Sequence, residues 1–286
     1  MSIRTISVLG AGLMGRGIAY VAALGGYETR LQDASRSQLE KGLAEIDAIL
    51  EKGVATGKVP DEDAIASRRR LSGADTLEEA ARGADLVIEA VPERIELKVE
   101  IFAQLDRLAP KHAILASNTS SLSITEMAAA TGRAPQVVGL HFFNPVHRMK
   151  LLEIVRALET SDATIAACEA AGARMGKECV TVRESPGFVT SRINAMIGNE
   201  AFYMLQEGVA SAADIDKALK LGLNHPMGPF ELVDLVGLDT RLSILKFLHR
   251  SLGEKFRPCP LIEQYVAAGR LGRKAGRGVY EYANKG

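Results

Sequence analysis

A glycine-rich loop near the start of the chain has the residue types and spacing that bind phosphate groups. It reads Gly10-Ala11-Gly12-Leu13-Met14-Gly15 and lies between a short apolar run, 5–9, and an alanine- and leucine-rich stretch through Leu24. Gly10 permits a tight turn, Gly12 lets a pyrophosphate approach the backbone, and Gly15 allows a helix to pack closely on a strand. Because the loop falls between a predicted strand and a predicted helix, a dinucleotide site is a better interpretation than a turn without a ligand.

An acidic residue follows this loop at the end of the next predicted strand, 28–32. Asp33 is placed to accept hydrogen bonds from the ribose hydroxyls of the adenosine. The same carboxylate would repel a 2′-phosphate, which favours NAD over NADP. Arg30 and Arg36 lie nearby in the sequence and weaken that preference, so NADP is the less favoured alternative.

A histidine offers the base that an alcohol dehydrogenation needs, because its ordinary pKa lies near neutral pH. The chain has five histidines. His141 closes a predicted strand, 137–140, at the carboxyl edge where open α/β sheets bind their ligands. A histidine with a purely structural role at a strand end is the alternative.

The elements that must position these groups alternate between strands and helices. Strands are expected at 5–9, 28–32, 86–90, 113–116, 137–140, 150–155 and 179–182, with helices between them such as 38–52, 96–108 and 163–175. This alternation predicts a Rossmann-type, doubly wound parallel sheet, and the polar segment 53–70 is expected to form a second helix or arm inserted into it.

The pattern changes after Glu184. Helical periodicity appears at 188–206, 212–220, 230–248 and 261–268, without a convincing strand. We therefore expect an α/β dinucleotide-binding domain, 1–184, followed by an all-α domain, 185–286.

Composition narrows the classes of function. The 35 basic and 35 acidic side chains cancel, so a nucleic-acid-binding surface is not expected. The three cysteines are irregularly spaced, so no metal site is expected and a reducing compartment is favoured. No apolar stretch is long enough to cross a membrane, and we expect a soluble, cytoplasmic protein.

Several motifs in order resemble the 3-hydroxyacyl-CoA dehydrogenase family, and within it the bacterial 3-hydroxybutyryl-CoA dehydrogenases. They are Ser117-Asn118-Thr119-Ser120-Ser121, Gly139-Leu140-His141-Phe142-Phe143-Asn144-Pro145, Glu184-Ser185-Pro186-Gly187-Phe188, Asn224-His225-Pro226-Met227-Gly228-Pro229 and the tail 272–278. With the glycine loop, the resemblance covers essentially the whole chain.

The resemblance implies a set of catalytic residues. His141 matches the family's base, Glu153 matches the carboxylate that orients and stabilises it, and Ser120 matches the serine that bonds the reacting oxygen. A serine before a helix can also act as an N-cap, and we assign that role to Ser123, which is followed by Glu126 in a capping-box pattern.

The resemblance also implies contacts to cofactor and substrate. Residues expected around the nicotinamide half are Glu93, Lys98, Asn118, Ser120, Asn144 and Lys274, of which Ser120 and Asn144 also face the substrate. Glu93 and Lys98 are equally well explained as ordinary residues of the helix that follows Pro92.

Two positions depart from the family. Ser191 stands where much of the family has an asparagine near the substrate, and Asn194 is a possible substitute one helical turn on. A CoA-binding lysine of the family falls on Gly53, so Lys52 or Lys58 would have to contact the CoA phosphates.

The predicted function is hydride transfer between NAD and a short-chain (3S)-3-hydroxyacyl-CoA, in a homodimer formed through the helical domain. A dehydrogenase of a free hydroxy acid or sugar acid is the second hypothesis. A non-catalytic dinucleotide-binding protein is the third, although such a protein would need no base at His141.

Overall fold

The computed structural model describes residues 2–282, and the chain divides into two compact units, 1–184 and 185–286. The strands of the first unit are β1 Thr5–Leu9, β2 Glu28–Gln32, β3 Leu71–Ala74, β4 Leu86–Glu89, β5 Ile114–Ser117, β6 Val137–Phe142, β7 Leu151–Arg156 and β8 Glu178–Arg183. Its helices are α1 Leu13–Leu24, α2 Arg36–Ala55, α3 Asp61–Arg70, α4 Leu77–Ala81, α5 Ile95–Leu108, α6 Ile124–Ala129 and α7 Asp162–Arg174, with a 3-10 turn, η1, at Ala134–Gln136.

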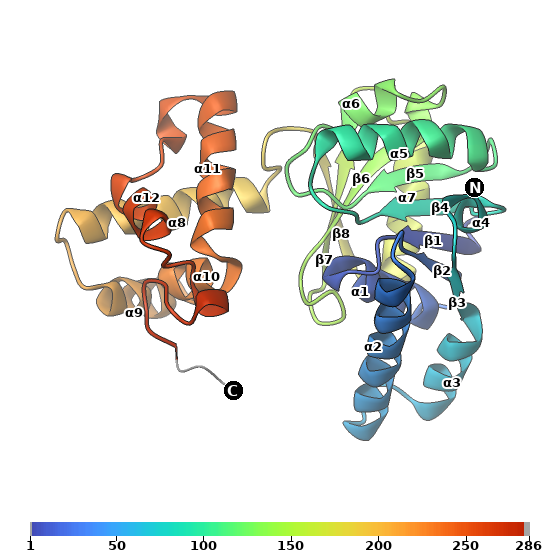
Figure 1. Cartoon of the computed structure of the whole chain (residues 1–286), viewed down its shortest axis with the longest axis horizontal. Coiled ribbons are helices and arrows are strands. Elements are labelled where there is room, and N and C mark those ends of the chain that lie inside the picture. The colour runs from blue at the N-terminus through green and yellow to red at the C-terminus, as the bar shows by residue number, and fades with distance from the viewer. Residues whose placement is uncertain (1, 283–286) are drawn as a thin grey trace. The chain divides into compact units, whose positions relative to one another are not determined.

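The strands of this unit form one sheet in the order β3-β2-β1-β4-β5-β6-β7-β8. The central strands β4, β5 and β6 are buried along their whole length, as expected of parallel strands with helices on both faces. The chain leaves β1 toward β2 through α1 and leaves β4 toward β5 through α5, so these right-handed crossovers place the two helices on opposite faces (Figure 1). The predicted Rossmann-type fold is confirmed.

One part of the expected sheet was wrong. The sheet is not wholly parallel, because β7 runs antiparallel to β6. The connection between them, 143–150, is too short for the crossover that a parallel pair requires. The edge strand β3 was not expected at all, since Leu71-Ser72-Gly73-Ala74 has little apolar character.

The expected arm is present as two helices, α2 and α3 (Figure 1). Leu39, Ile46 and Leu50 on α2 are buried, and Arg68 on α3 donates to Asp47 on α2 at 2.5 Å. The polar remainder of the arm faces solvent, which explains why its sequence is poor in apolar residues.

The second unit is helical in its described part, 185–282. Its helices are α8 Thr190–Gln206, α9 Ala212–Gly222, α10 Pro229–Val236, α11 Leu238–Leu252 and α12 Pro260–Ala267, with 3-10 turns η2 Glu254–Phe256 and η3 Arg273–Ala275. The core is built on aromatic contacts such as Phe202 against Phe230, whose ring centroids are 5.2 Å apart. The single helix expected at 230–248 is broken at Gly237, whose φ of 103° is incompatible with a continuous helix.

Candidate active site

The glycine loop has the shape of a phosphate cradle. Gly10 has a φ of +94°, and a Cβ there would lie 2.7 Å from the carbonyl oxygen of Ala90. A Cβ on Gly15 would lie only 1.7 Å from the Gly10 oxygen. Gly12 is different, because a Cβ there would meet no atom within 4 Å and the residue is the N-cap of α1 without a side-chain cap. Gly10 and Gly15 are therefore needed for packing, whereas Gly12 leaves open space at a helix N-terminus that favours anions.

Asp33 lies beside this loop. Its Oδ2 accepts a hydrogen bond from the backbone N–H of Ala11 at 2.8 Å, and its Oδ1 accepts from the N–H of Ser35 at 2.9 Å. Both bonds fix the carboxylate next to the N-terminus of α1. Leu13 at the start of that helix is exposed, while Met14 packs on the core.

The loop also occupies the point where the sheet reverses its winding. β1 pairs with β2 on one side and with β4 on the other, and the connections from β1 and β4 run to opposite faces. The carboxyl ends of β1 and β4 therefore flank the crevice in which doubly wound sheets bind ligands.

A histidine–carboxylate pair lies further along the same sheet, on β6, which is two strands beyond β4, and on its neighbour β7. His141 on β6 and Glu153 on β7 are directly opposite each other in the antiparallel pair, and His141 Nδ1 is 2.7 Å from Glu153 Oε2. Both side chains are almost completely buried. The ring of Phe143 lies against the imidazole, with centroids 4.4 Å apart. The short, buried contact fixes the ring, as is required of a catalytic base.

The loops after β4 and β5 are joined by side-chain contacts. Glu93 accepts hydrogen bonds from the Thr119 hydroxyl and, at 3.1 Å, from the backbone N–H of Ser120. Asn118 accepts through Oδ1 from the N–H of Phe142 at 2.9 Å, next to His141. These residues therefore lie at the carboxyl ends of the strands, on the same side of the sheet as His141.

Ser123 and Ser120 were expected to have different roles, the first as a helix cap and the second as a substrate contact. Ser123 accepts from the N–H of Glu126 at 3.1 Å and caps α6, which confirms its expected capping role. Ser120 is half-buried in the loop before it. Asn144 is exposed, two residues beyond the end of β6.

Lys98 occupies an unexpected position. Its side chain is fully buried, and its Nζ lies 2.7 Å from Glu89 and 3.1 Å from Glu93. Lys98 is therefore not an ordinary surface residue of the helix, which was one of its two interpretations from the sequence.

Sequence reasoning did not identify Glu89. A signal was present, because Glu89 is the one charged residue of Leu86–Glu89, a strand buried at every position.

The remaining predicted residues lie on the arm and in the helical unit. Lys52 is exposed in the last turn of α2. Next to it, a Cβ on Gly53 would lie 2.7 Å from Val59 Cγ2, so packing explains the small residue there. In the helical unit, Ser191 and Asn194 are half-buried in the first turns of α8, and Lys274 pairs with Asp239 at 2.6 Å.

Residues 2–282 lack two features that would point to other functions, a metal site and a membrane-spanning helix. These residues contain no group of histidine, cysteine, aspartate and glutamate side chains that could hold a metal ion. The helices of this part of the chain are all too short or too polar to span a membrane.

Comparison with known proteins matches both units. Residues 5–185 match the family model described as the NAD binding domain of 3-hydroxyacyl-CoA dehydrogenase, and residues 187–282 match the model of its C-terminal domain. The open space at Gly12, the tight packing at Gly10 and Gly15, and the carboxylate of Asp33 fit a bound NAD.

Individual relatives resemble the chain over nearly its whole length. A probable 3-hydroxybutyryl-CoA dehydrogenase of Bacillus subtilis (strain 168) is 49% identical over 100% of this chain and 99% of its own. The mitochondrial hydroxyacyl-coenzyme A dehydrogenase of Sus scrofa is 41% identical over 98% of this chain and 91% of its own. The crystal structure of (S)-3-hydroxybutyryl-CoA dehydrogenase from Ralstonia eutropha superposes with a TM-score of 0.95 at 45% identity, covering 99% of this chain and 100% of that one. This chain therefore belongs to the 3-hydroxyacyl-CoA dehydrogenase family and is an NAD-dependent oxidoreductase.

Proposed function

We propose that the protein interconverts a short-chain (3S)-3-hydroxyacyl-CoA and the corresponding 3-oxoacyl-CoA, with 3-hydroxybutyryl-CoA and acetoacetyl-CoA as its substrates. The observation that carries the proposal is the buried pair of His141 and Glu153. The pair lies on the same sheet as the glycine loop after β1, whose shape fits NAD. The relatives of Bacillus subtilis and Ralstonia eutropha, named for 3-hydroxybutyryl-CoA, support the chain length and the (S) configuration.

The pair supplies the proton chemistry. NAD, when bound, accepts the hydride from carbon 3 of the hydroxyacyl group. His141 takes the hydroxyl proton at Nε2, because its Nδ1 faces Glu153 and donates to that carboxylate. Glu153 fixes the tautomer and stabilises the imidazolium that forms. In the reverse direction, the imidazolium returns the proton to the oxygen of the 3-oxo group.

The surrounding residues bind and orient. Ser120 holds the reacting oxygen, and Asn144 and Ser191 contact the substrate. Residues that bind or support the nicotinamide half are Glu93, Lys98, Asn118, Ser120, Asn144 and Lys274, with Lys98 acting from below through Glu93. Lys52, exposed at the end of α2, contacts the CoA phosphates. The unit 1–184 is the NAD-binding domain, and the unit 185–286 is the helical domain to which we assign dimerisation and part of substrate binding.

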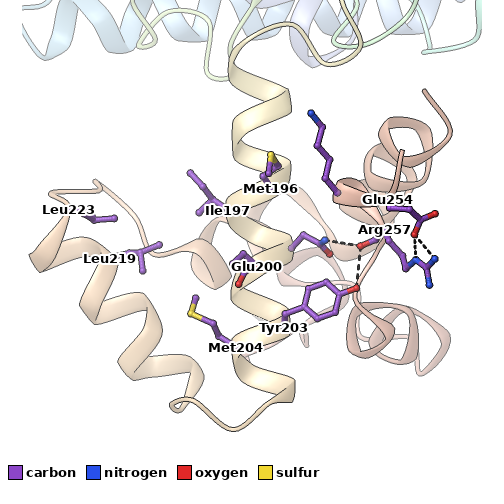
Figure 2. Close-up of a pocket in the computed structure, with 11 residues that line it drawn as sticks. Met196, Ile197, Glu200, Tyr203, Met204, Leu219, Leu223, Glu254 and Arg257 are labelled. Carbon is purple, nitrogen blue, oxygen red and sulfur yellow. Dashed lines mark hydrogen bonds and ion pairs between the residues drawn. The ribbon is translucent and has the colours of Figure 1, made fainter. Parts of the chain in front are cut away.

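The helical unit also supplies a homodimer interface. A hollow of about 540 Å³ lies on it, and Figure 2 shows Met196, Ile197 and Glu200 of α8 lining it with Leu219 and Leu223. Two apolar side chains of this unit are largely exposed: Leu223 at 66% and, on α8, Ile193 at 54%. A two-fold interface must be complementary to itself, and the lining carries both signs of charge. These are Glu200, Glu254, Lys255 and Arg257.

The dimer is tested by light scattering after size-exclusion chromatography. We expect a dimer for the wild type and a monomer for Leu223→Glu, with unchanged helix content. A wild-type monomer at assay concentration would contradict the proposed interface.

The cytoplasm is the proposed location. The three cysteines, Cys168, Cys179 and Cys259, are all free thiols, which is typical of a reducing compartment.

The test of the function is oxidation of NADH with acetoacetyl-CoA, compared with free acetoacetate and with NADPH as the alternative cofactor. We expect rapid turnover of the thioester with NADH alone. Turnover of free acetoacetate at a similar kcat/KM, or tight NADH binding without turnover, would overturn the acyl-CoA assignment.

A further inference from the structure

A fully buried carboxylate lies beneath the loops of the proposed active site. Glu89 ends β4, and its side chain has no exposed surface. Its Oε1 accepts from the N–H of Val91 at 2.7 Å and from Lys98 Nζ at 2.7 Å. Its Oε2 accepts from the Ser117 hydroxyl at 2.6 Å and from the same ammonium at 2.9 Å. One carboxylate thus connects the ends of β4 and β5 with α5.

Lys98 connects the buried carboxylate of Glu89 with a second carboxylate nearer the surface, that of Glu93. Its ammonium, also without exposed surface, lies 3.1 Å from Glu93 Oε2 as well as 2.7 Å from Glu89. The side chain of Glu93 is 41% exposed, so the lysine bridges a fully buried carboxylate and one that reaches solvent. The position of the Glu93 carboxylate therefore depends on where Glu89 holds the ammonium.

Glu93 in turn holds the loop that follows β5. It accepts from the Thr119 hydroxyl and from the N–H of Ser120. The Thr119 oxygen accepts from the backbone N–H of Leu122 at 2.9 Å, which fixes the turn leading to α6. A continuous series of contacts therefore runs from Glu89 to the segment that carries Ser120.

We propose that Glu89 is a positioning residue of the dehydrogenase reaction: it anchors Lys98, Lys98 sets the carboxylate of Glu93, and Glu93 holds the loop of Ser120. Glu89 itself touches neither substrate nor cofactor, because it is enclosed. The inference rests on the proposed function in two respects, the contact between Ser120 and the reacting oxygen and the place of Glu93 at the nicotinamide half.

Physical chemistry separates this role from a contribution to stability alone. Replacing both members of a buried ion pair with neutral groups of similar size is often neutral for stability, whereas removing one member leaves an uncompensated charge. A neutral pair can therefore restore the fold without restoring the electrostatic placement of Glu93. Small displacements of groups that hold a substrate can still cost up to about 100-fold in rate.

The experiment compares Glu89→Gln, Lys98→Met and the double variant. We expect Lys98→Met to lower the unfolding temperature most, because two carboxylates then lose their shared counter-ion. The double variant should regain most of that loss, yet all three should lower kcat/KM for acetoacetyl-CoA by about 10-fold or more. NADH affinity, measured from the fluorescence of the bound coenzyme, should fall in parallel because Glu93 lies at the nicotinamide half.

A matched control lies at the opposite end of α5. Arg133 Nε contacts Asp106 Oδ1 at 2.8 Å, and this largely buried pair joins the end of α5 to the segment before β6, at the other edge of the sheet. Arg133→Met and Asp106→Asn should each lower the unfolding temperature. At an assay temperature well below unfolding, both variants should keep the wild-type kcat/KM.

Two outcomes would overturn the proposal. In the first, the double variant regains wild-type kcat/KM together with its stability, which would make the cluster purely structural. In the second, the control variants lose kcat/KM in proportion to their stability. If the wild type does not reduce acetoacetyl-CoA, the proposed substrate fails instead, and the NADH affinities of the same variants still decide whether Glu89 positions Glu93.

Discussion

His141 and Glu153 occupy directly opposed positions of the antiparallel pair β6 and β7, which brings Nδ1 to 2.7 Å from Oε2 in the interior of the protein. Because the imidazole acts on the substrate proton, His141→Gln should lower kcat by about 10²–10⁴-fold and change NADH affinity only a few-fold. Stopped-flow turnover and coenzyme fluorescence measure the two quantities.

The Glu153→Gln variant tests the same pair from the other side. An amide can donate to Nδ1 and so favours the tautomer with the proton on Nε2, which cannot act as the base. We expect a loss of kcat comparable to that of His141→Gln. His112→Gln, at the opposite edge of the sheet, is the control and should retain full turnover. A loss of NADH affinity as large as the loss of kcat would contradict the assigned role.

Local patterns in the sequence were sufficient for one part of the site and insufficient for the rest. The glycine loop and Asp33 could be predicted because their spacing follows directly from the strand–turn–helix geometry. Lys98 could not be placed correctly, since its burial depends on Glu89 from a different strand. The break at Gly237 depends on a positive φ that apolar periodicity alone does not report.

Two similar substitutions in the glycine loop should affect different properties, one the stability of the fold and the other the affinity for NADH. Gly15→Ala would place a methyl group 1.7 Å from the Gly10 oxygen, so it should destabilise the fold by about 3 kcal/mol. Gly12→Ala meets no atom within 4 Å and has a φ of −67°, so stability should be unchanged. Its methyl group would instead obstruct the pyrophosphate, and NADH affinity should fall by about 10-fold or more. Thermal unfolding and coenzyme titration of both variants test the pair. Equal effects on stability would show that the loop is not shaped as described.

Asp33 should control which dinucleotide is accepted. Asp33→Ala removes the acceptor for the N–H of Ala11 and the negative charge that repels a 2′-phosphate. A charged hydrogen bond contributes about 1.5–3 kcal/mol, so NADH affinity should fall by about 10-fold or more while the preference over NADPH narrows. Steady-state kinetics with both coenzymes measure this. An unchanged preference would show that other residues recognise the ribose.

Asp85 makes the free energy of unfolding of the first unit depend on pH in the acidic range. Burial raises the pKa of this carboxyl, but the backbone N–H groups of Thr5 and Arg4 and the ring of His112 together lower it below its ordinary value. A carboxyl with a lowered folded-state pKa stabilises the protein above the unfolded value of about 3.9, and this contribution disappears as the pH falls through the folded pKa. Asp85→Asn should therefore cost about 2 kcal/mol at neutral pH, and this cost should shrink progressively as the pH falls below about 3.9. Urea unfolding at several pH values tests this, and a pH-independent difference would contradict it.

Ser191, which the sequence resemblance places at a family asparagine position, is half-buried in the first turn of α8. If this residue contacts the substrate, Ser191→Ala should lower kcat/KM for acetoacetyl-CoA about 5-fold through the loss of one hydrogen bond, and Ser191→Asn should retain or exceed the wild-type value. Asn194→Ala is the matched variant one turn further along the helix. A loss confined to Asn194→Ala would move the contact to that residue, whereas a Ser191→Asn variant that fails to fold would assign Ser191 to the packing of α8.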